Sequence, residues 1–212
     1  MKLHIGCEYV LMPGWINADI KNEWPMEKKG IKGLLKLFNF KVMDATQPWE
    51  YEDNSLDLIY SEHLIEHLSY EGAKTFVKEA YRTLKPGGTI RTAWPDLNFL
   101  IELFHNPEKY PEYIKAHCDL FHPELIEDFG IENVPVSYVI SDHFKMWGHQ
   151  IMYSMNDLIK LFNYAGFTNI RQCNFGESEI PELMNIEHTN NKMGKASEDI
   201  VKLETSIIEC TK

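Results

Sequence analysis

The sequence is poor in cysteine and in positive charge. Its 212 residues include four scattered cysteines without a CxxC spacing, Cys7, Cys118, Cys173 and Cys210. This usage is unlike that of a disulfide framework or a zinc cluster, so we expect reduced thiols and a cytoplasmic location. Lys and Arg number 21 against 32 Asp and Glu, which gives a formal net charge of −11. So acidic a chain is a poor match for nucleic acid or for an anionic membrane surface.

Long apolar runs and internal repeats are absent as well. No run approaches the roughly 18 apolar residues of a membrane-spanning helix. His4 and Glu8 interrupt the apolar stretch near the N-terminus, which therefore does not indicate a signal peptide. Hydrophobic residues make up 44% of the chain, enough for a sizeable core. The length predicts a single domain over residues 1–212.

Short apolar runs alternate with helical patterns, which predicts an α/β fold. Strands that are buried on both faces of a sheet carry such runs. We expect strands at residues 3–5, 15–20, 40–43, 56–60, 89–94, 168–172 and 203–211. A long polar loop over residues 174–201 separates the last two, which suggests an antiparallel pair at one edge of the sheet.

Helical patterns have clear boundaries in two places. Ser69 is a plausible N-cap for a helix whose apolar stripe runs from Ala73 to Leu84, and the sequence Lys-Pro-Gly-Gly at 85–88 ends it. Ser154 and Asp157 have the spacing of a capping box, and Gly166 ends the helix that follows. Residues 97–150 hold aromatic, Pro and His residues without a clean period. We expect them to form a cap of short helices and loops over the carboxyl edge of the sheet.

Acidic residues follow several of the predicted strands. Ligands of open α/β sheets bind beyond the carboxyl ends of the strands. Asp19 could accept hydrogen bonds from ribose hydroxyls, and Asp44 from an adenine amino group. Either aspartate alone is better explained as the start of a turn. The ordered set Gly6, Asp19, Asp44 and Glu62 favours a ligand site.

Four segments together resemble class I S-adenosylmethionine-dependent methyltransferases, and in particular the small type 11 group. They read LHIGC at 3–7, PGWINADI at 13–20, SLDLIYSEHLIEH at 55–67 and LKPGG at 84–88. The resemblance implies a Rossmann-like, seven-stranded, mostly parallel sheet with an antiparallel last strand, and S-adenosylmethionine as the cofactor. The strand ends then supply the predicted cofactor-binding residues: Gly6, Cys7, Glu8, Asp19, Ile20, Asp44, Ala45, Ser61 and Glu62.

The first loop departs from the family pattern. Glu8 stands where the family usually has a glycine, so its side chain narrows the approach of the cofactor or else faces the cofactor's ammonium or sulfonium group. Only nine residues separate Gly6 from Ile16, fewer than a parallel crossover with a helix usually needs. We therefore expect the usual helix to be reduced to a turn around Pro13 and Gly14.

Histidines near the expected cavity are candidates for acid–base chemistry. His63 follows the fourth strand and is predicted to be the general base or a substrate ligand. His143 and His149, at the end of the cap, are the further catalytic candidates, with a structural role as the alternative. His67 also falls near the expected cavity, with capping or packing at the start of the helix as the alternative.

The sequence predicts no metal site. His63 and His67 are four residues apart, but the zinc motif HExxH has its Glu directly after the first His. A divalent ion held by Glu62, Glu66 and a cap histidine is a minor alternative. Four aromatic residues could line the pocket or belong to the core: Trp94, Tyr60, Phe144 and Trp147.

The leading function is methyl transfer from S-adenosylmethionine to a small-molecule, sugar or natural-product acceptor. Two alternatives stay open. The first is a different use of the same cofactor, by intramolecular cyclisation or aminocarboxypropyl transfer. The second is a non-catalytic binding subunit with the cofactor fold. The expected partner is a small-molecule substrate, with neither nucleic acid nor membrane, and a homodimer is compatible with the sequence.

Overall fold

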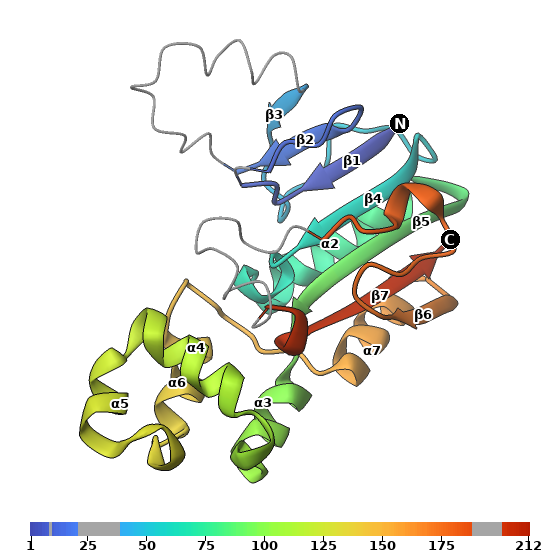
Figure 1. Ribbon diagram of the computed structural model, residues 1–212. Coiled ribbons are helices and arrows are strands. Elements are labelled where there is room, and N and C mark those ends of the chain that lie inside the picture. The colour runs from blue at the N-terminus through green and yellow to red at the C-terminus, as the bar shows by residue number, and fades with distance from the viewer. Residues whose placement is uncertain (9, 21–38, 188–200) are drawn as a thin grey trace, which may run out of the picture.

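A computed structural model describes residues 1–8, 10–20, 39–187 and 201–212 (Figure 1). Within these residues the strands form one seven-stranded sheet in the order β3-β2-β1-β4-β5-β7-β6. The strands are β1 (Lys2–Ile5), β2 (Ile16–Asp19), β3 (Phe40–Val42), β4 (Leu56–Glu62), β5 (Leu84–Pro95), β6 (Asn169–Cys173) and β7 (Thr205–Thr211).

The strand directions confirm the predicted fold class. The pairs β1–β2, β1–β4, β2–β3 and β4–β5 are parallel, whereas β7 runs antiparallel to both of its neighbours, β5 and β6. Each predicted run overlaps one of the strands. The strand β5 begins earlier than expected, because Leu84 pairs with Leu56 before the chain loops out and Thr89 pairs with Leu58.

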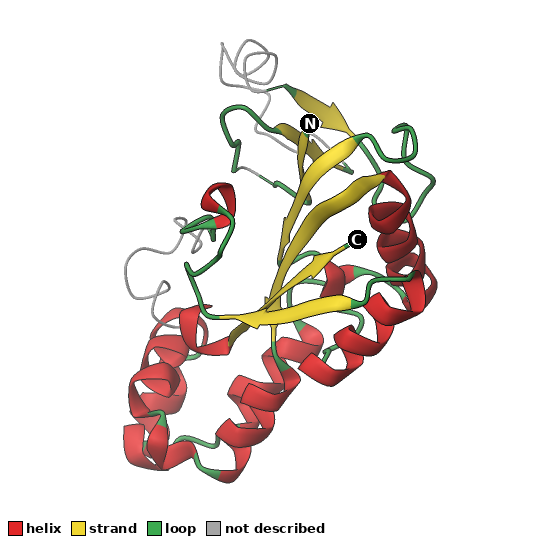
Figure 2. Cartoon of the chain, turned by 90° about the vertical axis from the view of Figure 1, so that its right-hand side faces the viewer, coloured by secondary structure: helices red, strands yellow, loops and turns green. Residues whose placement is uncertain are grey.

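Helices α2 (Tyr70–Thr83) and α7 (Met155–Ala165) cover one face of the sheet (Figures 1 and 2). Their predicted ends are confirmed. The Ser69 side chain accepts a hydrogen bond from the Gly72 amide, and Ser154 with Asp157 forms a complete capping box. Gly166 ends α7 in the left-handed conformation. Apolar side chains of both helices pack against β1, β4 and β5 in one core.

The opposite face is covered by a segment that the sequence suggested to be only a polar loop. Residues 174–187 include the short 3-10 helix η4 (Pro181–Leu183). Leu183 and Ile186 are buried in a cluster with Leu58 and Tyr60 of β4. Residues 188–200 of the predicted loop lie outside the described residues. Residues 201–204 are helical, so β7 begins at Thr205 and the prediction of a strand from Leu203 was wrong.

The expected helical cap is present and lies beyond the carboxyl end of β5 (Figure 1). It comprises α3 (Leu97–His105), η2 (Pro107–Lys109), α4 (Pro111–Phe121), α5 (Pro123–Phe129), η3 (Ile131–Asn133) and α6 (Ser137–Lys145). Proline opens η2, α4 and α5, where its missing N–H costs no helical hydrogen bond. The cap has a small core of its own, formed by Leu103, Tyr113, Ile114, Cys118, Leu125 and Val139.

None of the described helices combines the length and the apolar character that crossing a bilayer would require.

Candidate active site

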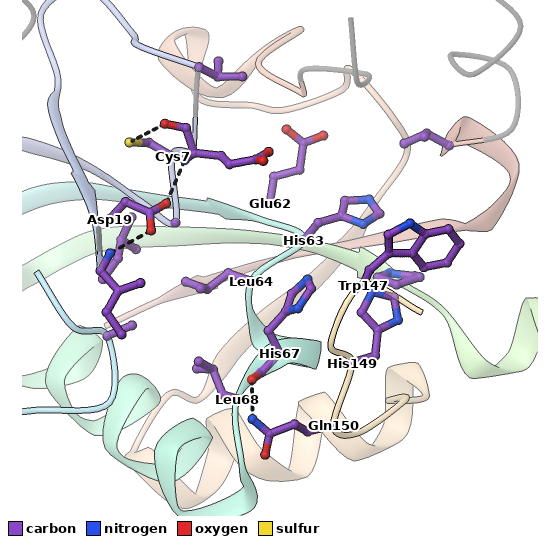
Figure 3. A pocket seen from close by; sticks show the side chains of 18 of the residues that line it. Cys7, Asp19, Glu62, His63, Leu64, His67, Leu68, Trp147, His149 and Gln150 are labelled. Atoms are coloured by element: carbon purple, nitrogen blue, oxygen red, sulfur yellow. Dashed lines mark hydrogen bonds between the residues drawn. The ribbon is translucent and has the colours of Figure 1, made fainter. Parts of the chain in front are cut away.

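A cavity of about 860 Å³ opens at the carboxyl ends of the strands, between the sheet and the cap. Strand-end residues and cap residues both line it. Figure 3 shows Cys7 and Asp19 on one side of the cavity, and the rings of His63, His67, His149 and Trp147 gathered on the other. A volume of this size suits a cofactor-sized ligand.

The cavity wall begins with a tight turn at Gly6, directly after β1. Gly6 has a φ of 72°, a conformation that side chains disfavour. A Cβ atom there would lie 3.0 Å from the Cβ of Leu64, in the loop that follows β4. Glycine is therefore required both by the backbone and by the close approach of Leu64.

Asp19, at the end of β2, is held rigidly at the cavity. Its Oδ2 accepts a hydrogen bond from the Glu8 amide at 2.8 Å, and its Oδ1 accepts one from the Ile20 amide at 2.7 Å. Each carboxylate oxygen can accept more than one hydrogen bond. Asp19 can therefore keep this orientation while it binds ligand hydroxyls.

Glu8, which stands where the family usually has a glycine, leaves the loop conformation intact. Glu8 has a φ of 43°, which is the left-handed conformation that a glycine at this position would favour. Its side chain adds a carboxyl group to the cavity lining. The expected shortening is confirmed, because residues 6–8 and 10–15 contain turns around Pro13 and Gly14 and no helix.

The other predicted cofactor-binding residues differ in position. Cys7, Ile20, Asp44, Ala45 and Glu62 line the cavity. Ser61 does not. Its buried hydroxyl lies 3.2 Å from the Thr92 hydroxyl of the neighbouring strand β5. Successive side chains of a strand point to opposite faces of the sheet, so Ser61 lies on the face opposite to that of Glu62.

Asp44 both starts a turn and lines the cavity. Its Oδ1 accepts hydrogen bonds from the Thr46 amide and hydroxyl, at 2.8 and 2.7 Å, so the residue does start a turn.

Burial and the nearby Asp19 raise the pKa of Cys7 to about 12. The Cys7 thiol is therefore neutral near pH 7 and is a poor nucleophile.

His63 is poorly suited to act as a base. Its Nδ1 lies 3.4 Å from Glu66 Oε1, and its Nε2 lies 3.2 Å from the Thr205 hydroxyl. Burial disfavours the charged ring, but Glu66 and more distant carboxylates outweigh burial and raise the pKa of His63 to about 9. The ring already carries the proton that a base would have to accept.

His143 is engaged through both ring nitrogens. Its Nδ1 lies 3.2 Å from the Val139 carbonyl, and its Nε2 lies 3.1 Å from Glu204 Oε2. The Tyr113 hydroxyl donates to the same Glu204 oxygen at 2.6 Å. Burial opposes the charged ring, but Glu204 raises the pKa of His143. This arrangement joins the cap to the start of β7, which is a positioning role.

His149 offers a free lone pair. Its Nδ1 lies 2.8 Å from the His143 carbonyl oxygen, which can only accept, so Nδ1 carries the proton. The Nε2 atom is then unprotonated in the neutral ring. Burial lowers the pKa of His149. Among the three predicted catalytic histidines, His149 has the protonation state that suits a base or a metal ligand.

The cavity lining includes polar residues that the sequence did not single out, among them His117, Gln150 and Glu204. His67, expected near the cavity with packing at the helix start as the alternative, also lines it. Glu204 lies at the end of a polar stretch without any recognisable motif. Trp147, predicted as a lining aromatic, is confirmed at the cavity. Trp94 and Tyr60 are fully buried in the core instead.

Comparisons with known proteins agree with the resemblance seen in the sequence. The family model described as "Methyltransferase domain", of the type 11 group, matches residues 18–92. No curated protein matches the chain. The resemblance to class I S-adenosylmethionine-dependent methyltransferases is thus confirmed for this segment, and S-adenosylmethionine is the cofactor that the domain implies.

Solved structures of low sequence identity share the fold. A SAM-dependent methyltransferase from Archaeoglobus fulgidus is 19% identical, with a TM-score of 0.54 over 100% of this chain and 85% of its own. One from Thermotoga maritima is 17% identical, with a TM-score of 0.50 over 100% and 81%. One from Mesorhizobium loti is 11% identical, with a TM-score of 0.53 over 100% and 90%.

Proposed function

We propose that the protein binds S-adenosylmethionine in the cavity and transfers its methyl group to a small-molecule acceptor. The observation that carries the proposal is the composition of the cavity, which joins strand-end carboxylates on one side to a group of histidines and Trp147 on the other. The first side suits the cofactor, and the second leaves room for an acceptor.

The residues present fit the cofactor. The tight turn at Gly6, which has no space for a Cβ atom, brings backbone to the cavity wall where the methionine end would lie. Asp19 is oriented to accept from the ribose hydroxyls, and Asp44 with Ala45 lies where the adenine would bind. The carboxyl group of Glu8 suits a ligand with a cationic amino group. When bound, the cofactor supplies a methyl group on positively charged sulfur, which becomes a neutral thioether as the methyl group leaves.

The chain's own contribution is mainly positioning. Methyl transfer is an in-line displacement, and holding the reactants in line supplies much of the rate enhancement. Trp147, which is 45% exposed, and the rings of His67 and His149 offer aromatic and polar contacts to an acceptor. The cap reduces the access of water from its side. The unprotonated Nε2 of His149 can receive the acceptor's proton. It can also bind a metal ion that activates the acceptor.

The shape of the site and the charge of the chain support a small-molecule acceptor. A cavity between sheet and cap admits a metabolite, a sugar or a natural-product intermediate more readily than a folded macromolecule. The acidic composition disfavours nucleic acid and anionic membranes as partners. All four cysteines are free thiols, which accords with a cytoplasmic location.

The proposal is tested by incubating the protein with S-adenosylmethionine and a protein-free metabolite extract and measuring the products by mass spectrometry. Methyl transfer predicts S-adenosylhomocysteine together with a methylated metabolite. The position of Glu8 in the cavity lining favours a second candidate function, in which the same cofactor undergoes aminocarboxypropyl transfer or cyclisation. That reaction would release methylthioadenosine instead. Absence of cofactor binding would contradict both and favour a non-catalytic binding protein.

A further inference from the structure

Two distant segments meet at the histidine side of the cavity. Glu66 and His67 belong to the short 3-10 helix η1 (Ile65–His67), and His149 precedes Gln150 and Ile151 in the chain that leaves the cap. The amides of Gln150 and Ile151 donate to the Glu66 carbonyl at 2.7 and 3.2 Å. The Gln150 side chain donates to the His67 carbonyl at 2.7 Å (Figure 3). These hydrogen bonds fix His149 beside Glu66 and His67.

The Glu66 carboxylate beneath these rings is fully buried, and among the described residues it has the ion pairs with His63 and His67 but no close hydrogen bond. Neither Oε1 nor Oε2 has a hydrogen-bond partner among the described residues, and the residue has no exposed surface. Its polar neighbours are ring nitrogens: Oε1 lies 3.4 Å from His63 Nδ1 and 3.9 Å from His67 Nε2. Buried carboxylates are normally paired with close hydrogen bonds or bound to a metal ion. Because these distances are longer than those of a good hydrogen bond, the carboxylate oxygens can still accept a closer ligand.

His149 is oriented as metal-binding histidines usually are. Its Nδ1–H donates to the His143 carbonyl at 2.8 Å. Metal-ligating histidines typically donate their second ring nitrogen to such an acceptor, which fixes the tautomer and the ring orientation. The ring of His149 meets that of His67 edge to face, with the centroids 4.8 Å apart. The remaining nitrogen of His149 therefore has its lone pair available.

We propose that Glu66, His67 and His149 bind a divalent transition-metal ion of the zinc class. One ligand atom from each residue lies within 4.8 Å of the other two. Ligands about 2 Å from an ion lie at most about 4 Å apart, so small rotations of the side chains close the set. Two imidazoles and one carboxylate suit zinc or iron, with positions left open for other ligands.

The open positions would face the cavity. His67 and His149 line it, whereas Glu66 lies beneath. An acceptor hydroxyl bound to the ion would lose its proton to water more readily. Its oxygen would then form a bond to the methyl carbon as the methyl–sulfur bond breaks. This role rests on the proposed function, but binding of the metal does not. The proposed site departs from the expectation of no metal. It shares Glu66 and a histidine at the end of the cap with the weighed alternative, but has His67 in place of Glu62.

The test is a titration of tag-free, chelator-treated protein with Co²⁺ alone, followed by visible absorption, with Zn²⁺ as the competitor. We expect one Co²⁺ per chain, displaced by Zn²⁺. Glu66→Gln, His67→Ala and His149→Ala should each weaken Co²⁺ binding by at least about tenfold, since even outer-shell changes cost that much. His105→Ala, at an exposed position in α3, is the matched control and should leave binding unchanged.

The outcomes separate the two proposals. Absence of saturable Co²⁺ binding, or binding that all three variants retain, would overturn the metal site. Thermal unfolding and S-adenosylmethionine titration of each variant show whether it still folds. His67 is partly exposed, so its alanine variant should keep the fold even if Glu66→Gln does not. Co²⁺ binding without cofactor binding would contradict the proposed function and leave the metal site standing.

Discussion

The carboxylate of Asp19, at the end of β2, accepts a hydrogen bond from the backbone amide of Glu8, in the loop after β1, at 2.8 Å. This bond joins two strand ends and holds Glu8 in a left-handed conformation, with a φ of 43°. The cavity therefore keeps the backbone shape of a glycine loop although a glutamate occupies the position. This part of the cavity wall depends on the pair of residues.

Gly6→Ala is expected to destabilise the protein more than Gly14→Ala. Both glycines have positive φ, 72° and 78°, so either alanine strains the backbone. At Gly6 the new Cβ would also press on Leu64, whereas nothing lies within 4 Å at Gly14. We expect a loss of about 2–4 kcal/mol for Gly6→Ala and about 1 kcal/mol for Gly14→Ala. Urea unfolding measures both, and equal losses would contradict the role assigned to Leu64.

Glu79→Gln is expected to lower stability near neutral pH by about 1–2 kcal/mol. Glu79 in α2 accepts hydrogen bonds from the Arg82 side chain at 3.0 and 2.6 Å and from the Trp49 amide at 2.6 Å. The hydrogen bonds from Arg82 are the main cause that lowers the pKa of Glu79.

The pH dependence of that effect has a definite sign. A lowered pKa means that the stabilisation is complete above the ordinary glutamate pKa, near 4.5, and is lost as the pH falls through the lower folded-state pKa. The difference between wild type and Glu79→Gln should therefore shrink in acid. Glu71→Gln, on the exposed side of α2, is the control with little effect. A difference that grows in acid would contradict the assignment.

Arg91→Met is expected to cost about 3–5 kcal/mol of stability. The buried Arg91 side chain pairs with Glu187 and Glu209, so its removal takes the shared guanidinium from two buried carboxylates, of which Glu209 keeps Arg171. Arg171→Met is the comparison, because Arg171 also pairs with Glu209 but is 38% exposed, and its loss should cost about 1 kcal/mol or less. Denaturant unfolding measures both, and similar losses would show that burial does not set the cost.

The sequence predicted the sheet because local patterns determine it. Apolar runs, the N-cap at Ser69, the capping box at Ser154 and the stop at Gly166 each act over a few residues. The resemblance then supplied the number of strands and the antiparallel direction of the last one. The cover formed by residues 174–187 could not be predicted, because Leu183 and Ile186 reach β4 from a polar segment without periodicity.

The histidine side of the cavity shows where sequence patterns fail. His63 is the natural base by position, but the buried Glu66 beside it raises its pKa to about 9. His149 depends on a hydrogen bond to the His143 carbonyl, which no motif reveals. Glu204 reaches His143 from a different part of the chain. Protonation and ligand geometry are set by tertiary contacts that spacing alone does not encode.

The proposed function requires that the cavity beside Asp19 binds S-adenosylmethionine. Calorimetric titration of the wild-type protein, Asp19→Ala and the control Glu71→Gln tests it most directly, with thermal unfolding to show that each variant folds. We expect one S-adenosylmethionine per chain for wild type and Glu71→Gln, and binding weakened about 10- to 100-fold for Asp19→Ala, since hydrogen bonds to a charged group are lost. Absence of binding to the wild type, or equal binding to folded Asp19→Ala, would contradict the account.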